Sequence, residues 1–183
     1  MDIKKLLRKY AAGERNFQRV TLHQAKLSRI DLSGADLSGA DLSGADLSRA
    51  KLRGCKLNCA NLTDADLSGA DLTGCDLTEI NLIGADLINA NLKGSTLYRA
   101  DLRSANLVRA IMLGTSLVDA DISGADLSGA NLCDANLMGC NLDEAEMRGA
   151  NLTGTKIAQE NLDETINHDT GLSHKWVTWA GSC

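Results

Sequence analysis

The residues best suited to chemistry in this chain are three histidines and six cysteines, and their spacing fits no catalytic or metal-binding pattern. His23, His168 and His174 lie in no recognisable catalytic triad or zinc signature. Cys55 and Cys59 are four residues apart, which is not the C-x₂-C spacing of a zinc site. Phosphate-binding and dinucleotide-binding glycine motifs are missing as well. The sequence therefore predicts a protein that is not an enzyme and needs no cofactor and no metal.

The elements that would position these residues follow from an internal repeat of five residues. From Phe17 to Leu162 an apolar residue falls at every fifth position, which makes 30 consecutive pentads, and leucine fills 25 of them. Two residues before each of these stands a small residue, most often alanine. Asp or Asn stands between the two in most pentads. This regularity is the strongest signal in the sequence.

A period of five fits neither an α-helix nor an extended strand. In a helix the leucines would spread around the axis, and in a strand every second leucine would face away from the core. The chain must therefore turn once per pentad. If each turn is about 90°, four pentads close a square coil of about 20 residues, with the leucine and the small residue pointing inward. The coils then stack at the usual strand spacing of about 4.8 Å.

The run ADLSGADLSGADLSGADLSRA resembles the A-(D/N)-L-x-x consensus of the pentapeptide-repeat family, and most closely its compact cyanobacterial members. The resemblance implies an all-β solenoid, a right-handed quadrilateral β-helix, here of about 7.5 coils by the count of pentads. The predicted inward residues include one or more leucines from every part of the repeat: Leu37, Leu42, Leu62, Leu82, Leu102, Leu127 and Leu152.

Both ends of the solenoid need protection, because bare strand edges invite aggregation. Residues 1–13 are predicted to form an N-terminal capping helix, residues 14–162 the β-helix, and residues 163–183 a C-terminal helical cap. In the C-terminal segment Leu172, Trp176 and Trp179 share one helical face. They are predicted to cap the last coil, with a homodimer contact through this end as the alternative.

Outward residues separated by multiples of 20 share a column along the rod, and two columns are candidates for function. One holds Asp46, Asp66, Asp86, Asp126 and Glu146. The resemblance implies DNA mimicry for such a stripe, as in family members that bind DNA gyrase. The local alternative, which we favour, is that these carboxylates accept hydrogen bonds from nearby backbone N–H groups.

The second candidate is a set of apolar residues on the outside of the middle coils. Tyr98, Val118 and Met138 stand directly after the leucine of their pentads, where Ser or Thr is usual. Ile88 and Val108 are further apolar residues at such positions. Exposed apolar patches mark partner sites in some proteins, although scattered apolar surface residues are also common.

Composition limits the partners and the location. The net charge is −5 at pH 7, so direct nucleic-acid binding and a membrane association are not expected. Neither a signal-peptide core nor a membrane-spanning run is visible, so the predicted location is cytoplasmic. The sequence predicts a structural or protein-interaction module with an unidentified protein partner. The alternative is a modulator of DNA gyrase.

Overall fold

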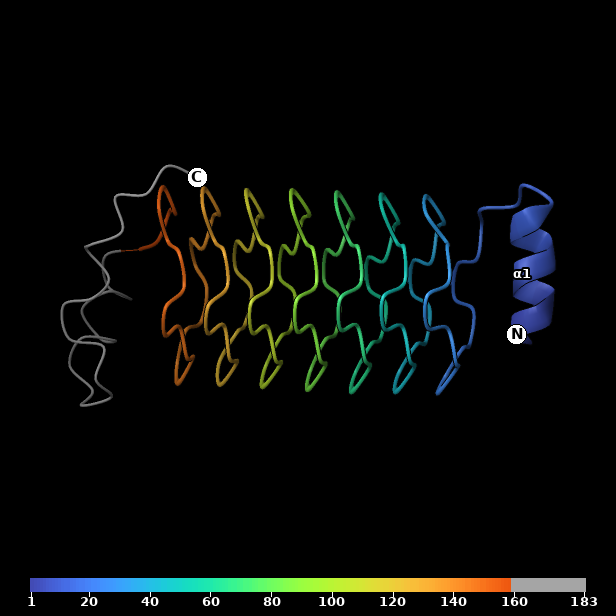
Figure 1. Cartoon of the computed structure of the whole chain (residues 1–183), viewed down its shortest axis with the longest axis horizontal. Coiled ribbons are helices and arrows are strands. Elements are labelled where there is room, and N and C mark those ends of the chain that lie inside the picture. Colours follow the sequence, from blue (N-terminus) through green and yellow to red (C-terminus); the bar gives the residue numbers. More distant parts are fainter. Residues whose placement is uncertain (159–183) are drawn as a thin grey trace.

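The computed structural model describes residues 1–158, which form a helix followed by a straight stack of square coils (Figure 1). Helix α1 spans Ile3–Ala11, and Asp2 caps it by accepting a hydrogen bond from the Lys4 N–H. Gly13 follows with a φ of +93°, a left-handed conformation that ends the helix. The remaining described chain runs as consecutive pentads up to residue 158.

Each coil contains 20 residues, as the spacing predicted. Residues 20 apart form parallel bridges in an unbroken series that runs from Asn16 with Asp36 to Asn136 with Lys156. Each bridge involves one residue per pentad, so within residues 1–158 no face of the rod is a continuous strand. The chain turns too often for a longer strand to form, although the register between neighbouring coils is that of a parallel sheet.

The pentad from Ala40 to Gly44 shows how the backbone hydrogen bonds are satisfied. Its first N–H, on Ala40, bonds to the carbonyl three residues earlier at 3.0 Å. The second, third and fifth N–H groups, on Asp41, Leu42 and Gly44, bond to carbonyls of the adjacent coils at 2.8–2.9 Å. The fourth, on Ser43, bonds instead to the side-chain Oδ1 of Asp41 at 3.1 Å. The fourth N–H is therefore the one group that needs a side chain as its acceptor.

The first and third residues of each pentad fill the interior. Leu37, Leu42, Leu62, Leu82, Leu102 and Leu127 are all at most 2% exposed, as predicted. Leu152 was predicted to be buried with them, but it is half-buried, because no later coil within residues 1–158 stacks on it. Each fully buried leucine contributes about 2 kcal/mol to folding, and neighbouring coils share that burial.

Helix α1 lies across the N-terminal end of the stack (Figure 1). Leu6 is completely buried in the core cluster, and Ile3 and Tyr10 pack against it. The Tyr10 ring lies 6.5 Å from that of Phe17, and its hydroxyl donates to the Ser33 carbonyl at 2.9 Å. The apolar side of α1 thus covers the first coil. The predicted C-terminal cap, residues 163–183, lies outside the described residues.

The fifth residue of each pentad adopts a left-handed conformation at the corner of the coil. Glycine occupies many of these positions, but arginine, asparagine and aspartate occur there too, with φ between 53° and 58°. The backbone conformation therefore does not by itself require glycine. In some coils the available space requires glycine. A Cβ on Gly84 would lie 2.5 Å from Oδ1 of Asp64, whereas a Cβ on Gly94 would meet nothing within 4 Å.

This difference predicts two unequal effects of the same substitution. Gly94→Ala should lower the free energy of unfolding by about 1 kcal/mol, the usual cost of a left-handed alanine. Gly84→Ala should cost at least about 1 kcal/mol more, because Asp64 must also move. Urea denaturation of both variants measures the two values.

The Asp64→Gly background provides the control for steric crowding. There the difference between Gly84→Ala and Gly94→Ala should disappear. If both substitutions lower the free energy of unfolding equally in the original background, the space around Gly84 is not crowded.

Candidate interaction surfaces

The predicted acidic stripe is a true column of the structure. Bridges join Asp46 to Asp66, Asp66 to Asp86, and Asp126 to Glu146, with the neutral Asn106 linking the two halves. Oδ1 of Asp46 accepts a hydrogen bond from the Ser48 N–H at 3.0 Å. Oδ1 of Asn106 accepts one from the Val108 N–H at 3.2 Å. An uncharged amide thus serves the fold as well as a carboxylate does.

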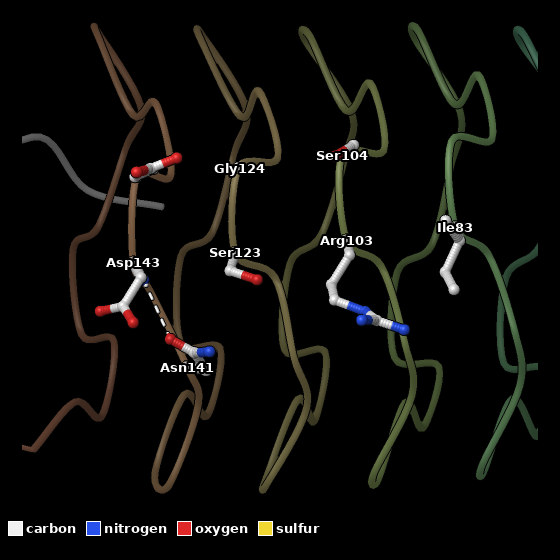
Figure 2. Close-up of a pocket in the computed structure, with 8 residues that line it drawn as sticks. Ile83, Arg103, Ser104, Ser123, Gly124, Asn141 and Asp143 are labelled. Atoms are coloured by element: carbon white, nitrogen blue, oxygen red, sulfur yellow. Dashed lines mark hydrogen bonds between the residues drawn. The ribbon is translucent and has the colours of Figure 1, made fainter.

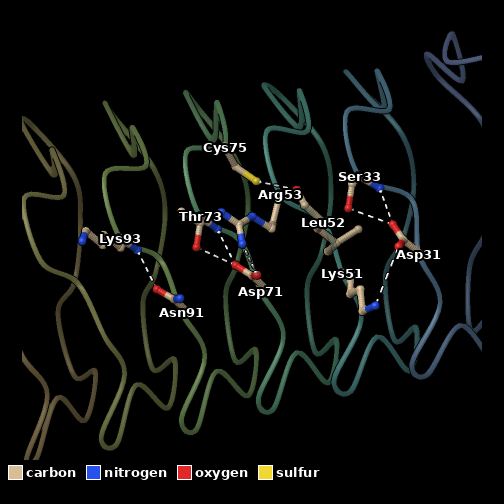
Figure 3. A network of polar contacts seen from close by, with 10 residues as sticks. All are labelled: Asp31, Ser33, Lys51, Leu52, Arg53, Asp71, Thr73, Cys75, Asn91 and Lys93. Atoms are coloured by element: carbon tan, nitrogen blue, oxygen red, sulfur yellow. Dashed lines mark hydrogen bonds and ion pairs between the residues drawn. The ribbon is translucent and has the colours of Figure 1, made fainter.

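The same bond occurs on all four faces of the rod. Every Asp or Asn at the second position of a pentad, from Asn16 to Asn151, accepts from the fourth N–H of its own pentad. Figure 3 shows three examples, at Asp31, Asp71 and Asn91. The local explanation of the acidic residues therefore has direct structural support, since this bond supplies the acceptor that the backbone lacks.

The hydroxyl of Ser48 strengthens this arrangement around Asp46. It donates to Oδ1 of Asp46 at 2.6 Å, beside the N–H of the same serine. These two hydrogen bonds hold the pKa of Asp46 below its ordinary value, and the same pair of bonds from Ser43 lowers the pKa of Asp41.

The apolar candidates separate into two groups that lie on different faces. Tyr98, Val118 and Met138 form one column, as predicted, next to the bridges that join Thr96, Ser116 and Asn136. Ile88 and Val108 stand ten residues from that column, which is half a coil. They therefore lie on the opposite face, and a single partner surface does not include both groups.

Two further apolar residues that the sequence also places outward complete a patch around the first group. Ile111 and Leu113 lie on the neighbouring face, and the chain turns at Gly114 onto the face of Val118. Ile111 is 42% exposed and Met138 is 43% exposed, the two largest values among the large apolar residues of the coils. We call this patch the apolar corner. It consists of Tyr98, Ile111, Leu113, Val118 and Met138. The 20-residue register alone would have been enough to find it.

The apolar corner coincides with departures from the second-position rule. Thr96, Ile111 and Ser116 replace Asp or Asn in the three pentads that contribute Tyr98, Leu113 and Val118. Isoleucine has no polar atom that could accept the hydrogen bond of the fourth N–H. The residues that the fold prefers are thus missing where the surface is most apolar.

A shallow groove of about 520 Å³ lies along another face (Figure 2). It is lined mostly by polar side chains, among them the half-buried Ser123 and the exposed Arg103, Asp143 and Glu144. Arg103 is already bound to Asp101 through two hydrogen bonds of 2.9 and 2.8 Å, which lower the pKa of that carboxyl group. The residues that line the groove include no histidine and no cysteine.

A comparison with protein families decides the identity of this fold. The family model described as pentapeptide repeats matches eight copies over residues 16–54, 45–82, 75–114 and 115–154. The chain is a pentapeptide-repeat protein. Proteins of this family form right-handed quadrilateral β-helices, and the square coils described above are such a helix.

Solved structures of other pentapeptide-repeat proteins are similar to the chain. HetL from the cyanobacterium Nostoc sp. strain PCC 7120, involved in heterocyst differentiation regulation, is 32% identical over 85% of this chain and 94% of its own, with a TM-score of 0.32. The protein alr5209 from Nostoc PCC 7120 is 43% identical over 57% of this chain and 79% of its own, with a TM-score of 0.40.

QnrB1, a plasmid-mediated fluoroquinolone resistance protein, is 21% identical over 84% of this chain and 88% of its own, with a TM-score of 0.48. No curated protein sequence gives a significant match to this chain.

Three buried cysteines of this pentapeptide-repeat protein, Cys55, Cys75 and Cys140, act as small core residues. Cys55 and Cys75 occupy first positions on adjacent coils and are both free thiols. Each donates a hydrogen bond to a leucine carbonyl, at 3.1 and 2.9 Å respectively. Burial raises the pKa of the Cys140 thiol to about 12, so it is not a reactive thiolate at neutral pH.

The remaining chemical candidates within residues 1–158 give no site either. His23 is exposed, and its Nδ1 lies 2.8 Å from the Ser43 hydroxyl. Among the described residues no group of His, Cys, Asp and Glu side chains has the geometry to hold a metal ion. None of the described helices is long and apolar enough to cross a membrane. His168, His174, Leu172, Trp176 and Trp179 lie outside the described residues.

The role of Asp46 leads to a prediction about pH. A folded-state pKa below the unfolded value contributes stability that is present at neutral pH and is lost as the pH falls through the folded pKa. The melting temperature should therefore fall below about pH 4. The Asp46→Asn variant keeps the acceptor, so its melting temperature should be close to that of the original chain at pH 7 and should fall less on acidification.

Asp46→Ala is the matched control. It removes the acceptor, and it should lower the free energy of unfolding at pH 7 by about 1 kcal/mol. Equal stability of the Ala and Asn variants would contradict the structural role of this column.

Proposed function

We propose that this pentapeptide-repeat protein is a non-enzymatic, cytoplasmic rod that binds another protein through the apolar corner. The observation that carries the proposal is the coincidence at that corner. Three pentads give up the Asp or Asn that satisfies the fourth N–H, and the same three place Tyr98, Leu113 and Val118 outward. Departures from local folding preference are expected at functional sites.

The shape of the rod also supports a role in protein binding. The interior is filled by a uniform series of small residues and leucines, and the described part holds no enclosed polar cleft in which a reaction could be shielded from water. The residue types at the outward positions differ from pentad to pentad within this chain, because each outward residue contacts few others. A surface that changes while the scaffold stays constant suits recognition better than catalysis.

Partner capture from extracts of the host organism tests the proposal. The double variant Tyr98→Ser with Val118→Ser should lose at least about ten-fold in the amount of partner retained, since aromatic and aliphatic anchors dominate protein interfaces. Ile88→Ser with Val108→Ser changes the opposite face and should retain the partner. Equal retention by both double variants would exclude the apolar corner as the binding site.

The second candidate function is modulation of DNA gyrase by duplex mimicry. The acidic column supports it, since five carboxylates from Asp46 to Glu146 share one face. Against it, the aspartates in this column hold backbone N–H groups, and Arg49 and Arg109 stand on the same face. The favoured function therefore remains protein binding through the apolar corner.

A gyrase supercoiling assay separates the two functions. We expect no change in supercoiling at a large molar excess of the protein. Inhibition or protection of gyrase that is lost on replacing Asp66 and Asp86 by Asn, which keeps the fold, would instead support duplex mimicry.

A further inference from the structure

Charge is distributed very unevenly along the rod. Residues 1–60 contain 12 Lys and Arg against 6 Asp and Glu, a net charge of +6. Residues 61–158 contain 6 Lys and Arg against 14 Asp and Glu, a net charge of −8. The protein is therefore acidic overall but carries a cationic N-terminal third, and the net charge of the whole chain conceals this.

The cationic third contains two arginines, Arg29 and Arg49, that stand one above the other in adjacent coils, unlike the other arginines at fifth positions. At the fifth positions of the pentads, the residue 20 positions after an arginine is otherwise glycine, which leaves room for the side chain, or aspartate, which carries the opposite charge. Cγ of Arg49 lies against Gly69, at 3.5 Å from where a Cβ would be, and Cγ of Arg109 lies at 3.4 Å from the corresponding point on Gly129. Arg99 instead has Asp119 in the next coil, with an N–O distance of 4.0 Å.

Arg29 is followed in the next coil by Arg49. Both have left-handed backbones, with φ of 57° and 56°, and both side chains are exposed. The bridge between Lys26 and Asp46 fixes these two coils in register, so the arginine backbones are about one strand spacing, roughly 4.8 Å, apart. Like charges directly opposite one another are destabilising. Neither arginine forms an ion pair with a carboxylate among the described residues.

Two lysines extend this pair on either side. Lys26 and Lys51 occupy second positions, where the fold prefers Asp or Asn, and an ammonium group accepts no hydrogen bond. Lys51 lies 4.0 Å from Asp31 across the coils, a weak exposed contact that Figure 3 shows. We call Lys26, Arg29, Arg49 and Lys51 the basic corner. At this corner two second positions lack the preferred Asp or Asn, and two arginines occupy the same column in adjacent coils.

We propose that the basic corner is a docking surface for a short acidic segment of a partner protein. Carboxylates from the partner would lie between the two guanidinium groups and relieve their repulsion, because arginine binds carboxylate through paired hydrogen bonds. The inference rests on the proposed role in protein binding but uses residues distinct from the apolar corner.

The charge distribution favours a short acidic peptide over a nucleic acid. The basic corner extends over two adjacent coils, whereas a duplex carries about one charge per 1.7 Å and would continue onto the coils that carry the net charge of −8. No aromatic residue stands beside these four side chains in their columns to stack on bases. A segment of a few Glu or Asp residues is short enough to stay on these two coils, where Asp31 and Asp46 are the carboxylates beside the basic corner.

Fluorescence anisotropy with a labelled deca-glutamate peptide tests the proposal. The full-length protein should bind the peptide at low salt, and binding should weaken as NaCl is added. The double variant Arg29→Glu with Arg49→Glu should bind at least about ten-fold more weakly. Arg109→Glu is the matched control, since Arg109 stands in the same column with the same backbone conformation, and it should bind nearly as the original chain does.

Three results would overturn the proposal: no peptide binding at low salt, equal losses in the double variant and the control, or tighter binding of a single-stranded oligonucleotide of the same charge. Analytical ultracentrifugation of the protein alone tests whether a second copy of this chain occupies the basic corner. If the protein self-associates and the double variant does not, the basic corner binds the acidic coils of a second copy and not an acidic peptide of another protein. Because the peptide assay does not involve the apolar corner, its failure leaves the capture result unaffected.

A stability measurement tests the repulsion itself, even if the double variant folds poorly. Arg29→Gln keeps a side chain that the left-handed corner accepts, as Gln24 shows with a φ of 53°. It should raise the melting temperature at low salt by removing a like-charge contact, and this gain should shrink at high salt. An unchanged or lower melting temperature at low salt would mean that the two arginines do not repel each other.

Discussion

The structure depends on one constraint, which is that each coil must satisfy the backbone of a chain that turns every five residues. Four of the five N–H groups in a pentad find carbonyl partners, three of them in adjacent coils and one within the turn. The fourth residue's N–H is left over, and the Asp or Asn two residues earlier accepts its hydrogen bond. The alternation of leucine and small residues then fills the interior that this frame encloses.

This constraint also determines how the surface is interpreted. An aspartate at the second position has a role in folding wherever it occurs, so a column such as Asp46, Asp66 and Asp86 needs no partner to explain it. Residues that fail to supply the acceptor need another explanation. Ile111 at the apolar corner and Lys51 at the basic corner are of this kind, and so both surfaces are proposed as binding sites.

The two corners differ in what they require from a partner. The apolar corner offers Tyr98, Val118 and Met138 in a column, and burial of such side chains gives affinity. The basic corner offers paired guanidinium groups, which give faster association and selectivity for carboxylates. The two corners lie on different coils.

The sequence by itself determined the period and the inward residues, because a leucine at every fifth position fits neither a helix nor a strand, and its A-(D/N)-L-x-x run carried the resemblance to the family. It also located the column of Tyr98, Val118 and Met138, since the register is simple arithmetic. It placed Ile88 and Val108 with them, whereas the closed coil puts these two on the opposite face. Only the tertiary structure decided that Asp64 crowds Gly84, and that Arg29 and Arg49 stand without carboxylate partners among the described residues. These properties depend on contacts between side chains 20 residues apart, and such contacts exist only once the coils have stacked.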